Sequence, residues 1–124
     1  MSCLFCDRIA SNSDILFENE FVVAIADGYP VSKGHLLIIP KRHIETYFEA
    51  SKAEKCEIDQ AIMTLKHRTD NLYQPDGYNI GINNGLASGQ SIMHLHVHLI
   101  PRYHGDCKNP RGGVRGVITE KQSY

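Results

Sequence analysis

Apolar and polar residues alternate along this chain with two different periods, and each period predicts one kind of element. Runs typical of β-strands occupy residues 15–18, 21–27, 35–39, 78–83 and 92–101. Between the third and fourth runs, apolar residues and one threonine recur at the helical spacings of four, three, four and three, at Ile58, Ile62, Leu65, Thr69 and Leu72. The pattern therefore predicts several short strands around one long helix.

The ends of these elements are marked by turn and capping residues. Ser51 and Glu54 have the spacing of a capping box, so we expect the helix to run from about 52 to 72. A short N-terminal helical turn is expected at residues 6–11. Strands on both sides of a single long helix predict the α+β class, with a mostly antiparallel sheet that the helix covers on one face.

The chain is expected to form one domain. Its 124 residues are near the commonest domain size. We assign residues 1–104 to the domain itself. From 105 to 124 the chain is polar and rich in glycine, which predicts an irregular, mildly basic tail that belongs to the same domain.

Three histidines within five residues carry the clearest chemical signal. Side chains alternate between the two faces of a strand, so His94, His96 and His98 would share one face, roughly 6.5–7 Å apart. The residues alone leave three interpretations open. The imidazoles could be polar groups on a solvated face, ligands of a catalytic metal, or a nucleophile with its helpers.

Several segments resemble one protein family. The triad with Gly89-Gln90-Ser91 before it and Pro101-Arg102 after it resembles the signature of the histidine triad (HIT) superfamily. Residues 27–43 look like the second signature of that family. Cys3-Leu4-Phe5-Cys6 and residues 109–115 look most like short prokaryotic HIT proteins, of the nucleoside phosphoramidase or dinucleoside polyphosphate hydrolase type. The resemblance covers nearly the whole chain and implies the HIT fold.

The resemblance also implies an activity. Members of the family cleave a substituent from the α-phosphate of a nucleotide through a nucleotidyl-histidine intermediate, as hydrolases or nucleotidyl transferases. It implies a purine nucleotide as substrate, with His96 as the nucleophile and His35, His94 and His98 as the other catalytic histidines. A neutral imidazole has a free lone pair near pH 7, which agrees with attack by His96.

The resemblance further assigns nucleotide-binding positions. Asp27 would accept hydrogen bonds from the ribose hydroxyls, and the remaining positions lie close to the phosphate: Asn83, Gly89, Gln90 and Ser91. Each of these residues is also an ordinary turn or loop residue, which is the alternative for it. Apolar walls for the base are expected from Phe5, Ile9, Phe21 and Ile25, or these residues are core.

Cys3 and Cys6 have the spacing of half a zinc site. The pair alone is a weak signal, because two free cysteines also pack as small apolar residues. In some short HIT proteins a histidine after the Pro-Lys-Arg turn and the first triad histidine complete the site. Here these are His43 and His94, so the resemblance implies a structural zinc ion, and it implies no organic cofactor.

Composition narrows the remaining classes of function. Thirteen basic and fourteen acidic residues give a net charge of −1, which provides no positive field for nucleic acid. The longest apolar run has six residues, too few to span a membrane, and no signal peptide is recognisable, so a cytoplasmic protein with reduced cysteines is expected. The family resemblance and an exposed sheet edge favour a homodimer. A nucleotide-binding sensor or partner-binding module, and a histidine metalloenzyme, remain the alternatives.

Overall fold

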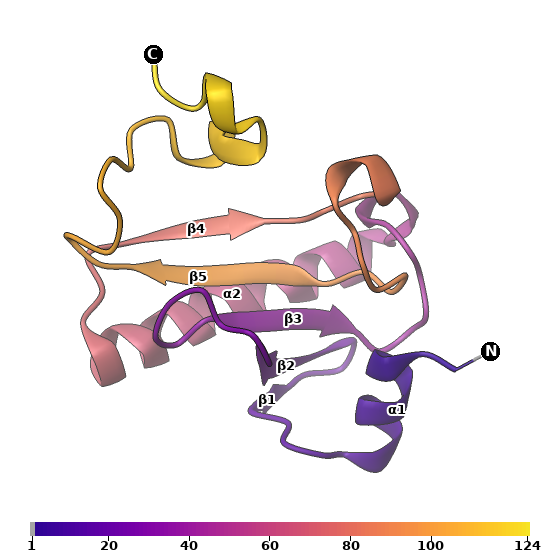
Figure 1. Ribbon diagram of the computed structural model, residues 1–124. Coiled ribbons are helices and arrows are strands. Elements are labelled where there is room, and N and C mark those ends of the chain that lie inside the picture. Colours follow the sequence, from indigo (N-terminus) through magenta and orange to yellow (C-terminus); the bar gives the residue numbers. More distant parts are fainter. Residues whose placement is uncertain (1) are drawn as a thin grey trace.

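The computed structural model describes residues 2–124, in which a five-stranded sheet lies between a long and a short helix (Figure 1). The helices are α1 (Leu4–Ser11) and α2 (Lys52–Tyr73). The strands are β1 (Phe17–Glu18), β2 (Val22–Ala26), β3 (Leu36–Pro40), β4 (Gly77–Gly81) and β5 (Val97–Arg102). Their spatial order is β1-β2-β3-β5-β4, and all neighbours are antiparallel. The expected α+β class is confirmed.

Helix α2 begins as the sequence predicted. The hydroxyl of Ser51 accepts the backbone N–H of Glu54 at 3.1 Å, and the carboxylate of Glu54 accepts the N–H of Ser51 at 2.8 Å. The buried face of the helix carries Ile58, Ala61, Leu65 and Thr69. Leu72 was expected on this face but is 69% exposed in the last turn of the helix.

The sheet has an apolar cluster on each face because side chains alternate along its strands. On the α2 face, Val22 and Ala24 pack with Leu36, Ile38 and residues of the helix. On the opposite face, Val23 and Ile25 pack with Leu37, Ile39 and with Phe5 of α1. We call these the α2 face and the α1 face. The functional side chains lie on the α1 face.

Strand β5 begins later than expected, at Val97 rather than at residue 92. The ladder between β3 and β5 pairs Ile38 with Val97, so its continuation would bring Pro40 opposite Leu95. Proline has no N–H to donate, which ends regular pairing at this point. The backbone N–H of Leu95 bonds instead to the carbonyl of Ile44 at 2.7 Å. Strand β4 ends at Gly81, two residues before its expected end.

The C-terminal tail contains two short 3-10 turns, Gly113–Val117 and Thr119–Lys121, and is irregular elsewhere. Figure 1 places it beyond β4, outside the body of the sheet. Gly112 has φ +90°, and a Cβ atom there would collide with the backbone of Gln122. The tail is therefore folded back on itself. Within the described residues, no helix is long and apolar enough to cross a membrane.

Candidate functional site

The three imidazoles of residues 94–98 lie together on the α1 face. His94 is fully buried, His96 is 8% exposed, and His98 is half-buried with its ring centroid 5.3 Å from that of His96. Leu95 and Val97 point the other way, into the core under α2. The alternation expected from the sequence therefore persists, although only His98 lies within the regular strand.

The ring of His96 is held in one orientation by the backbone. Its Nδ1 lies 2.9 Å from the carbonyl oxygen of His94, and this oxygen accepts a hydrogen bond from Nδ1–H. The second nitrogen of a neutral imidazole then carries the lone pair, so Nε2 of His96 is available for attack. Phe5 packs edge-on against the ring at a centroid distance of 5.1 Å.

His98 is connected to His35 and Asp27. The backbone N–H of Val31 donates to Nδ1 of His35 at 3.1 Å, which leaves the proton of that ring on Nε2. This Nε2–H lies 2.9 Å from Nδ1 of His98 and 3.3 Å from a carboxylate oxygen of Asp27. Because His98 accepts at Nδ1, its neutral ring carries its own proton on Nε2.

Burial favours the neutral form of three of these rings, those of His35, His94 and His98. It lowers the pKa of His98, and the neighbouring rings of His96 and His35 lower it further against the opposing carboxylate of Asp27. Burial also lowers the pKa of His35, and Asp27 offsets part of this shift. The pKa of His94 is lowered by burial as well.

Asp27, His35 and His98 bring one nitrogen or oxygen each to within 4.8 Å of one another, a spacing that a metal ion could also occupy. The hydrogen bond from Val31 argues against this use. It commits Nδ1 of His35 as an acceptor, so the atom that faces the other two groups carries a proton and no lone pair. The contacts here favour a hydrogen-bonded network over a metal centre.

Four residues form a second cluster at the other end of the triad: Cys3, Cys6, His43 and His94. Nδ1 of His94 lies 3.4 Å from Sγ of Cys3, 3.5 Å from Sγ of Cys6 and 3.1 Å from Nδ1 of His43. Around a tetrahedral zinc ion, sulfur and nitrogen ligands lie about 3.5 Å apart and two nitrogens about 3.3 Å apart. The spacing of the donor atoms fits such an ion.

The chemistry of the donors fits zinc as well. Nε2–H of His94 donates to the carbonyl of Pro40 at 2.7 Å, which leaves Nδ1 with its lone pair directed at the cysteines. Burial and the adjacent Cys3 raise the pKa of the Cys6 thiol. A divalent cation between the two sulfurs would reverse that effect, because metal binding favours thiolates.

Of the expected nucleotide-binding residues, Asn83 lines a hollow together with His35 and His98. Ser91 is exposed and lines a different hollow, beside Cys3 and His43. One carboxylate oxygen of Asp27 accepts a hydrogen bond from the backbone N–H of Tyr29 at 2.8 Å. This contact is typical of a turn, which was the alternative role for Asp27. Its other oxygen faces His35.

Gln90 is buried and its amide is used within the loop. Its Nε2 donates to the carbonyls of Glu45 at 2.7 Å and Ile92 at 3.1 Å, and its Oε1 accepts the N–H of Gly85 at 2.7 Å. Gly89 follows a 3-10 turn (Leu86–Ser88) with φ +94°, in the left-handed region that favours glycine. Gln90 thus ties the loop down between β4 and the triad.

The four residues expected to form apolar walls for the base lie on two different faces of the sheet. Phe5 and Ile25 are buried on the α1 face, and Ile9 packs against them. Phe21 packs on the α2 face and is therefore not part of this site. The side chain of Asn19 accepts the N–H groups of Phe21 and Val22, which makes a turn just before β2 and breaks the strand alternation at Phe21.

Some contributors to the site had no signal in the sequence. The carbonyl of Pro40 and the N–H of Val31 set the proton positions of His94 and His35, respectively. Both act through backbone atoms, so the type of residue does not reveal them. Both residues lie within the second family-like segment, residues 27–43, which is the one indication that the sequence offers.

Comparison with known proteins agrees with the resemblance noted from the sequence. The profile of the HIT domain matches residues 8–105. An uncharacterized HIT-like protein of Methanocaldococcus jannaschii is 39% identical over 106 residues, which cover 84% of this chain and 81% of that protein. Adenylylsulfatase HINT3 of Arabidopsis thaliana is 36% identical over 107 residues, covering 85% of this chain and 54% of that protein.

The fold is similar to that of solved structures. A zinc-bound histidine triad family protein from Mycobacterium smegmatis superposes with a TM-score of 0.77 at 30% sequence identity. The matched region covers 86% of this chain and 78% of that protein.

Proposed function

Because the chain belongs to the HIT family, we propose that it is a nucleotide hydrolase or nucleotidyl transferase that cleaves a substituent from the α-phosphate of a purine nucleotide. The observation that carries this proposal is the hydrogen bond between His96 and the carbonyl of His94. It leaves Nε2 of a nearly buried imidazole free to attack phosphorus. The phosphoramidase and dinucleoside polyphosphate hydrolase types both use this chemistry.

In the first half-reaction, Nε2 of His96 forms a bond to the α-phosphorus as the bond to the leaving group breaks. The electron pair of that bond departs with the leaving atom. The negative charge of the phosphate favours the imidazolium form of His98, which takes a proton from solvent at Nδ1 in place of the hydrogen bond from His35. The leaving atom then takes the Nε2 proton of His98, and the ring becomes neutral with its remaining proton on Nδ1.

In the second half-reaction, water attacks the phosphorus of the nucleotidyl-histidine. The water proton passes to Nε2 of His98, and the bond between phosphorus and His96 breaks, with its electrons returning to the imidazole. As the product leaves, the Nδ1 proton of His98 returns to solvent. His35 is a positioning residue, because its Nε2–H then fixes the neutral ring of His98 for the next substrate. An alcohol or amine in place of water would give nucleotidyl transfer.

Substrate binding is assigned to the residues that the family resemblance named. Asp27 accepts from the ribose hydroxyls, and Asn83, beside His98, contacts the phosphate. Gly89, Gln90 and Ser91 provide the loop over the phosphate, in which Gln90 acts by holding the loop in place. Phe5 and Ile25 support the base from the α1 face.

A structural zinc ion is part of this proposal. Cys3, Cys6, His43 and His94 would hold it, and a complete four-ligand shell leaves no position for substrate. Its contribution would be to fix the N-terminus and α1 on the sheet. His96 is outside the cluster and keeps its lone pair for the reaction.

A homodimer is also proposed. Strand β4 is at the edge of the sheet, and its Ile80 is 52% exposed. An edge strand with an exposed apolar side chain favours pairing with a second copy. The balanced charge gives no reason to expect nucleic acid as a partner.

The decisive experiment is to trap the intermediate. Wild-type protein, mixed with adenosine 5′-phosphoramidate and quenched during turnover, should gain the mass of one adenylyl group. His96→Ala should lose turnover by several powers of ten, gain no such mass, and still bind AMP. Substantial turnover by His96→Ala would refute the assignment. AMP binding without turnover by the wild type would instead indicate a nucleotide-binding module.

A further inference from the structure

A cavity of about 370 Å³ lies on the α2 face of the sheet, beside the loop of residues 27–35. Its walls are this loop, the C-terminal half of α2 and the ends of β2 and β3 that the loop joins. The buried side chains of Leu36 and Leu65 line it and belong to the apolar cluster of the α2 face. The volume is in the range of small-molecule sites, about 300–1,000 Å³. Phe5, Ile25 and the three histidines of the triad do not line it, so the cavity is separate from the proposed substrate site.

Much of the apolar surface of the cavity is open to water. Leu16, just before β1, and Leu72, in the last turn of α2, both line the cavity and are 51% and 69% exposed. The helical spacing places Leu72 on the buried face of α2, so its exposure follows from the cavity beside it. An apolar group in the cavity would remove both leucines from water, which favours binding.

Two cations line the cavity without a carboxylate partner. They are Arg68 of α2 and Lys33 of the loop, and no ion pair between described residues includes either. Nη1 of Arg68 donates to the carbonyl of Leu16 at 3.0 Å, which leaves further N–H groups of the guanidinium available. Nζ of Lys33 lies over the ring of Tyr73, 5.2 Å from its centroid. Positive charge therefore comes to the cavity from two of its walls.

Of the described residues that line the cavity, Asp27 alone carries a carboxylate, and this group is used elsewhere. One of its oxygens accepts the backbone N–H of Tyr29 at 2.8 Å, and the other lies 3.3 Å from Nε2 of His35. Asp27 therefore does not neutralise Arg68 or Lys33. An anion is the ligand that the charges of this cavity favour.

A buried hydroxyl adds a polar group to the apolar part of the cavity. Thr69 lines the cavity and is only 3% exposed. No hydrogen bond between described residues involves its hydroxyl, although every fully enclosed side-chain nitrogen or oxygen has a partner. The hydroxyl is therefore not fully enclosed and contacts the cavity, where it can donate to an acceptor or bind water.

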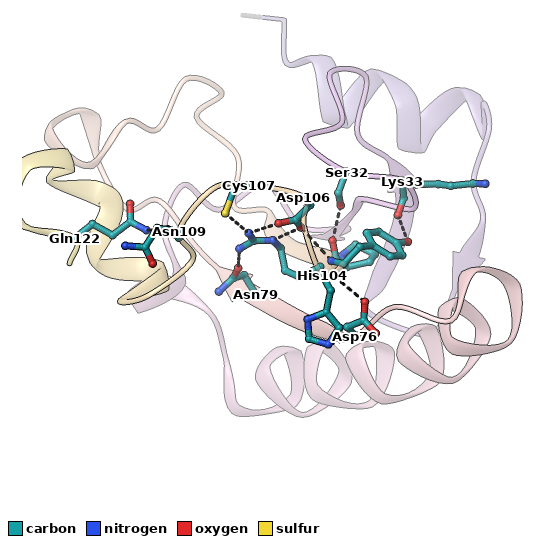
Figure 2. Close-up of polar contacts among 12 residues, drawn as sticks. Ser32, Lys33, Asp76, Asn79, His104, Asp106, Cys107, Asn109 and Gln122 are labelled. Atoms are coloured by element: carbon teal, nitrogen blue, oxygen red, sulfur yellow. Dashed lines mark hydrogen bonds and ion pairs between the residues drawn. The ribbon is translucent and has the colours of Figure 1, made fainter. Parts of the chain in front are cut away.

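The loop that forms one wall is anchored both to β5 and to α2. The hydroxyl of Ser32 donates to a carbonyl of β5 at 2.6 Å, and the hydroxyl of Tyr103 donates to the carbonyl of Lys33 at 2.7 Å (Figure 2). The side chain of Lys33 extends away from these contacts (Figure 2). A Cβ atom on Gly34 would lie 2.9 Å from the ring of Tyr73, so the loop backbone packs directly against the end of α2. The cavity is thus built from fixed elements, as preformed ligand sites are.

We propose that this cavity binds an amphipathic monocarboxylate, that is, an alkyl chain with one terminal carboxylate. The chain covers Leu16 and Leu72 and removes their surface from water. The carboxylate pairs with Arg68 and Lys33, which have no other anionic partner. This inference goes beyond the proposed function and does not depend on it, because neither the nucleophile nor the proton donor of that reaction lines the cavity.

Isothermal titration calorimetry with octanoate, octanol and octylammonium near neutral pH tests the proposal, because the three probes share one alkyl chain and differ in charge. The wild type should bind one octanoate per chain with a Kd below about 1 mM. Octanol and octylammonium should bind about tenfold more weakly or worse, because they lack the anion that pairs with the two cations. Equal affinity for octanoate and octanol would overturn the proposal.

The same titration in excess AMP distinguishes this cavity from the substrate site. The Kd of octanoate should be the same with and without AMP. Competition between AMP and octanoate would place the carboxylate on the α1 face and would overturn the proposal.

Variants of exposed residues assign the binding to the cavity. Arg68→Gln should weaken octanoate binding by about tenfold. Arg8→Gln is the matched control, because the Arg8 guanidinium also donates to a loop carbonyl, that of Ser13 at 3.2 Å, but lies on α1 outside the cavity. Leu72→Asp should abolish measurable binding, whereas Met63→Asp, an exposed position of the same helix outside the cavity, should bind as the wild type does.

The thermal unfolding midpoint of each variant shows that it is folded at the temperature of the titration. Octanoate binding that survives both Arg68→Gln and Leu72→Asp would refute the assignment to this cavity. So would a wild type that binds no octanoate and loses a dimer on Leu72→Asp, which would mean that a second copy of the chain covers the cavity.

Discussion

The carbonyl oxygen of His94 accepts a hydrogen bond from Nδ1 of His96, while the ring of His94 faces Cys3 and Cys6. One residue therefore contributes to two sites through different atoms. Its backbone orients the proposed nucleophile, and its side chain belongs to the candidate zinc cluster. The candidate zinc cluster and the nucleophile are adjacent but share no donor atom. We therefore expect removal of the zinc ligands and removal of His96 to have different effects.

We predict about one zinc ion per chain in protein purified without chelators. Cys3→Ser combined with Cys6→Ser should abolish the metal and lower Tm by more than about 10 °C, because metal binding is coupled to folding. Elemental analysis and thermal unfolding measure both effects. Cys56→Ser with Cys107→Ser is the matched control, since both thiols are exposed and outside the cluster.

Turnover should survive in the fraction of the zinc-free variant that remains folded, because His96 is not a ligand. Near-zero metal in the wild type would contradict the zinc site. Complete loss of turnover with an intact fold would instead support a catalytic metal.

We predict that acid destabilises the fold through His35 and His98. Burial lowers the pKa of both rings in the folded state, so below about pH 6.5 the unfolded chain binds more protons. The free energy of unfolding should therefore be largest above pH 6.5 and fall as the pH is lowered toward 5. Urea unfolding at several pH values measures this slope.

The control for this prediction is His67, which is exposed on α2. His35→Gln should flatten the slope between pH 7 and 5, whereas His67→Gln should leave it as in the wild type. Equal slopes for the wild type and His35→Gln would show that the buried network does not cause the acid sensitivity.

We predict that Gln90→Ala destabilises the nucleotide-free protein by about 1–3 kcal/mol. The amide of Gln90 satisfies the N–H of Gly85 and the carbonyl of Glu45, which the variant leaves without these partners. Urea unfolding without ligand checks this, with the exposed Gln60→Ala as control. An unchanged unfolding free energy with a raised KM would show that Gln90 acts on the nucleotide directly.

We predict that the wild type has twice the mass of one chain in light scattering at micromolar concentration. Ile80→Asp should shift it to the mass of a monomer, because a charge on β4 disfavours edge pairing. Leu16→Asp, on the opposite side of the sheet next to β1, is also about half exposed and should leave the mass unchanged. A wild-type monomer would rule out the dimer.

Local rules predicted the parts of the fold that depend on neighbouring residues. The capping box at Ser51 and the helix that follows it are present, and the alternation around His96 places the imidazoles on one face. The differences from the prediction have one long-range and one local cause. The start of β5 depends on Pro40 from another strand. Phe21 changes face because the side chain of Asn19, two residues before it, makes a turn that the apolar run does not indicate.

The candidate site shows the same division. The residue types of the triad and of the Cys3-Cys6 pair indicate their chemistry directly. The proton positions on His35 and His94 depend on backbone groups of Val31 and Pro40, which no motif specifies. The orientation of Arg111 and Arg115 in the tail depends on Tyr124 and on a carbonyl near the end of the chain, contacts that no motif specifies.

The two-residue alternation that separates Leu95 and Val97 from His96 and His98 also determines which sequence lengths this segment tolerates. Adding or deleting one residue between His94 and His98 would exchange the two sets of side chains. Imidazoles would enter the apolar core under α2 and aliphatic groups would enter the reaction site. A single substitution changes one side chain on one face, whereas an added or deleted residue would remove stability and chemistry together.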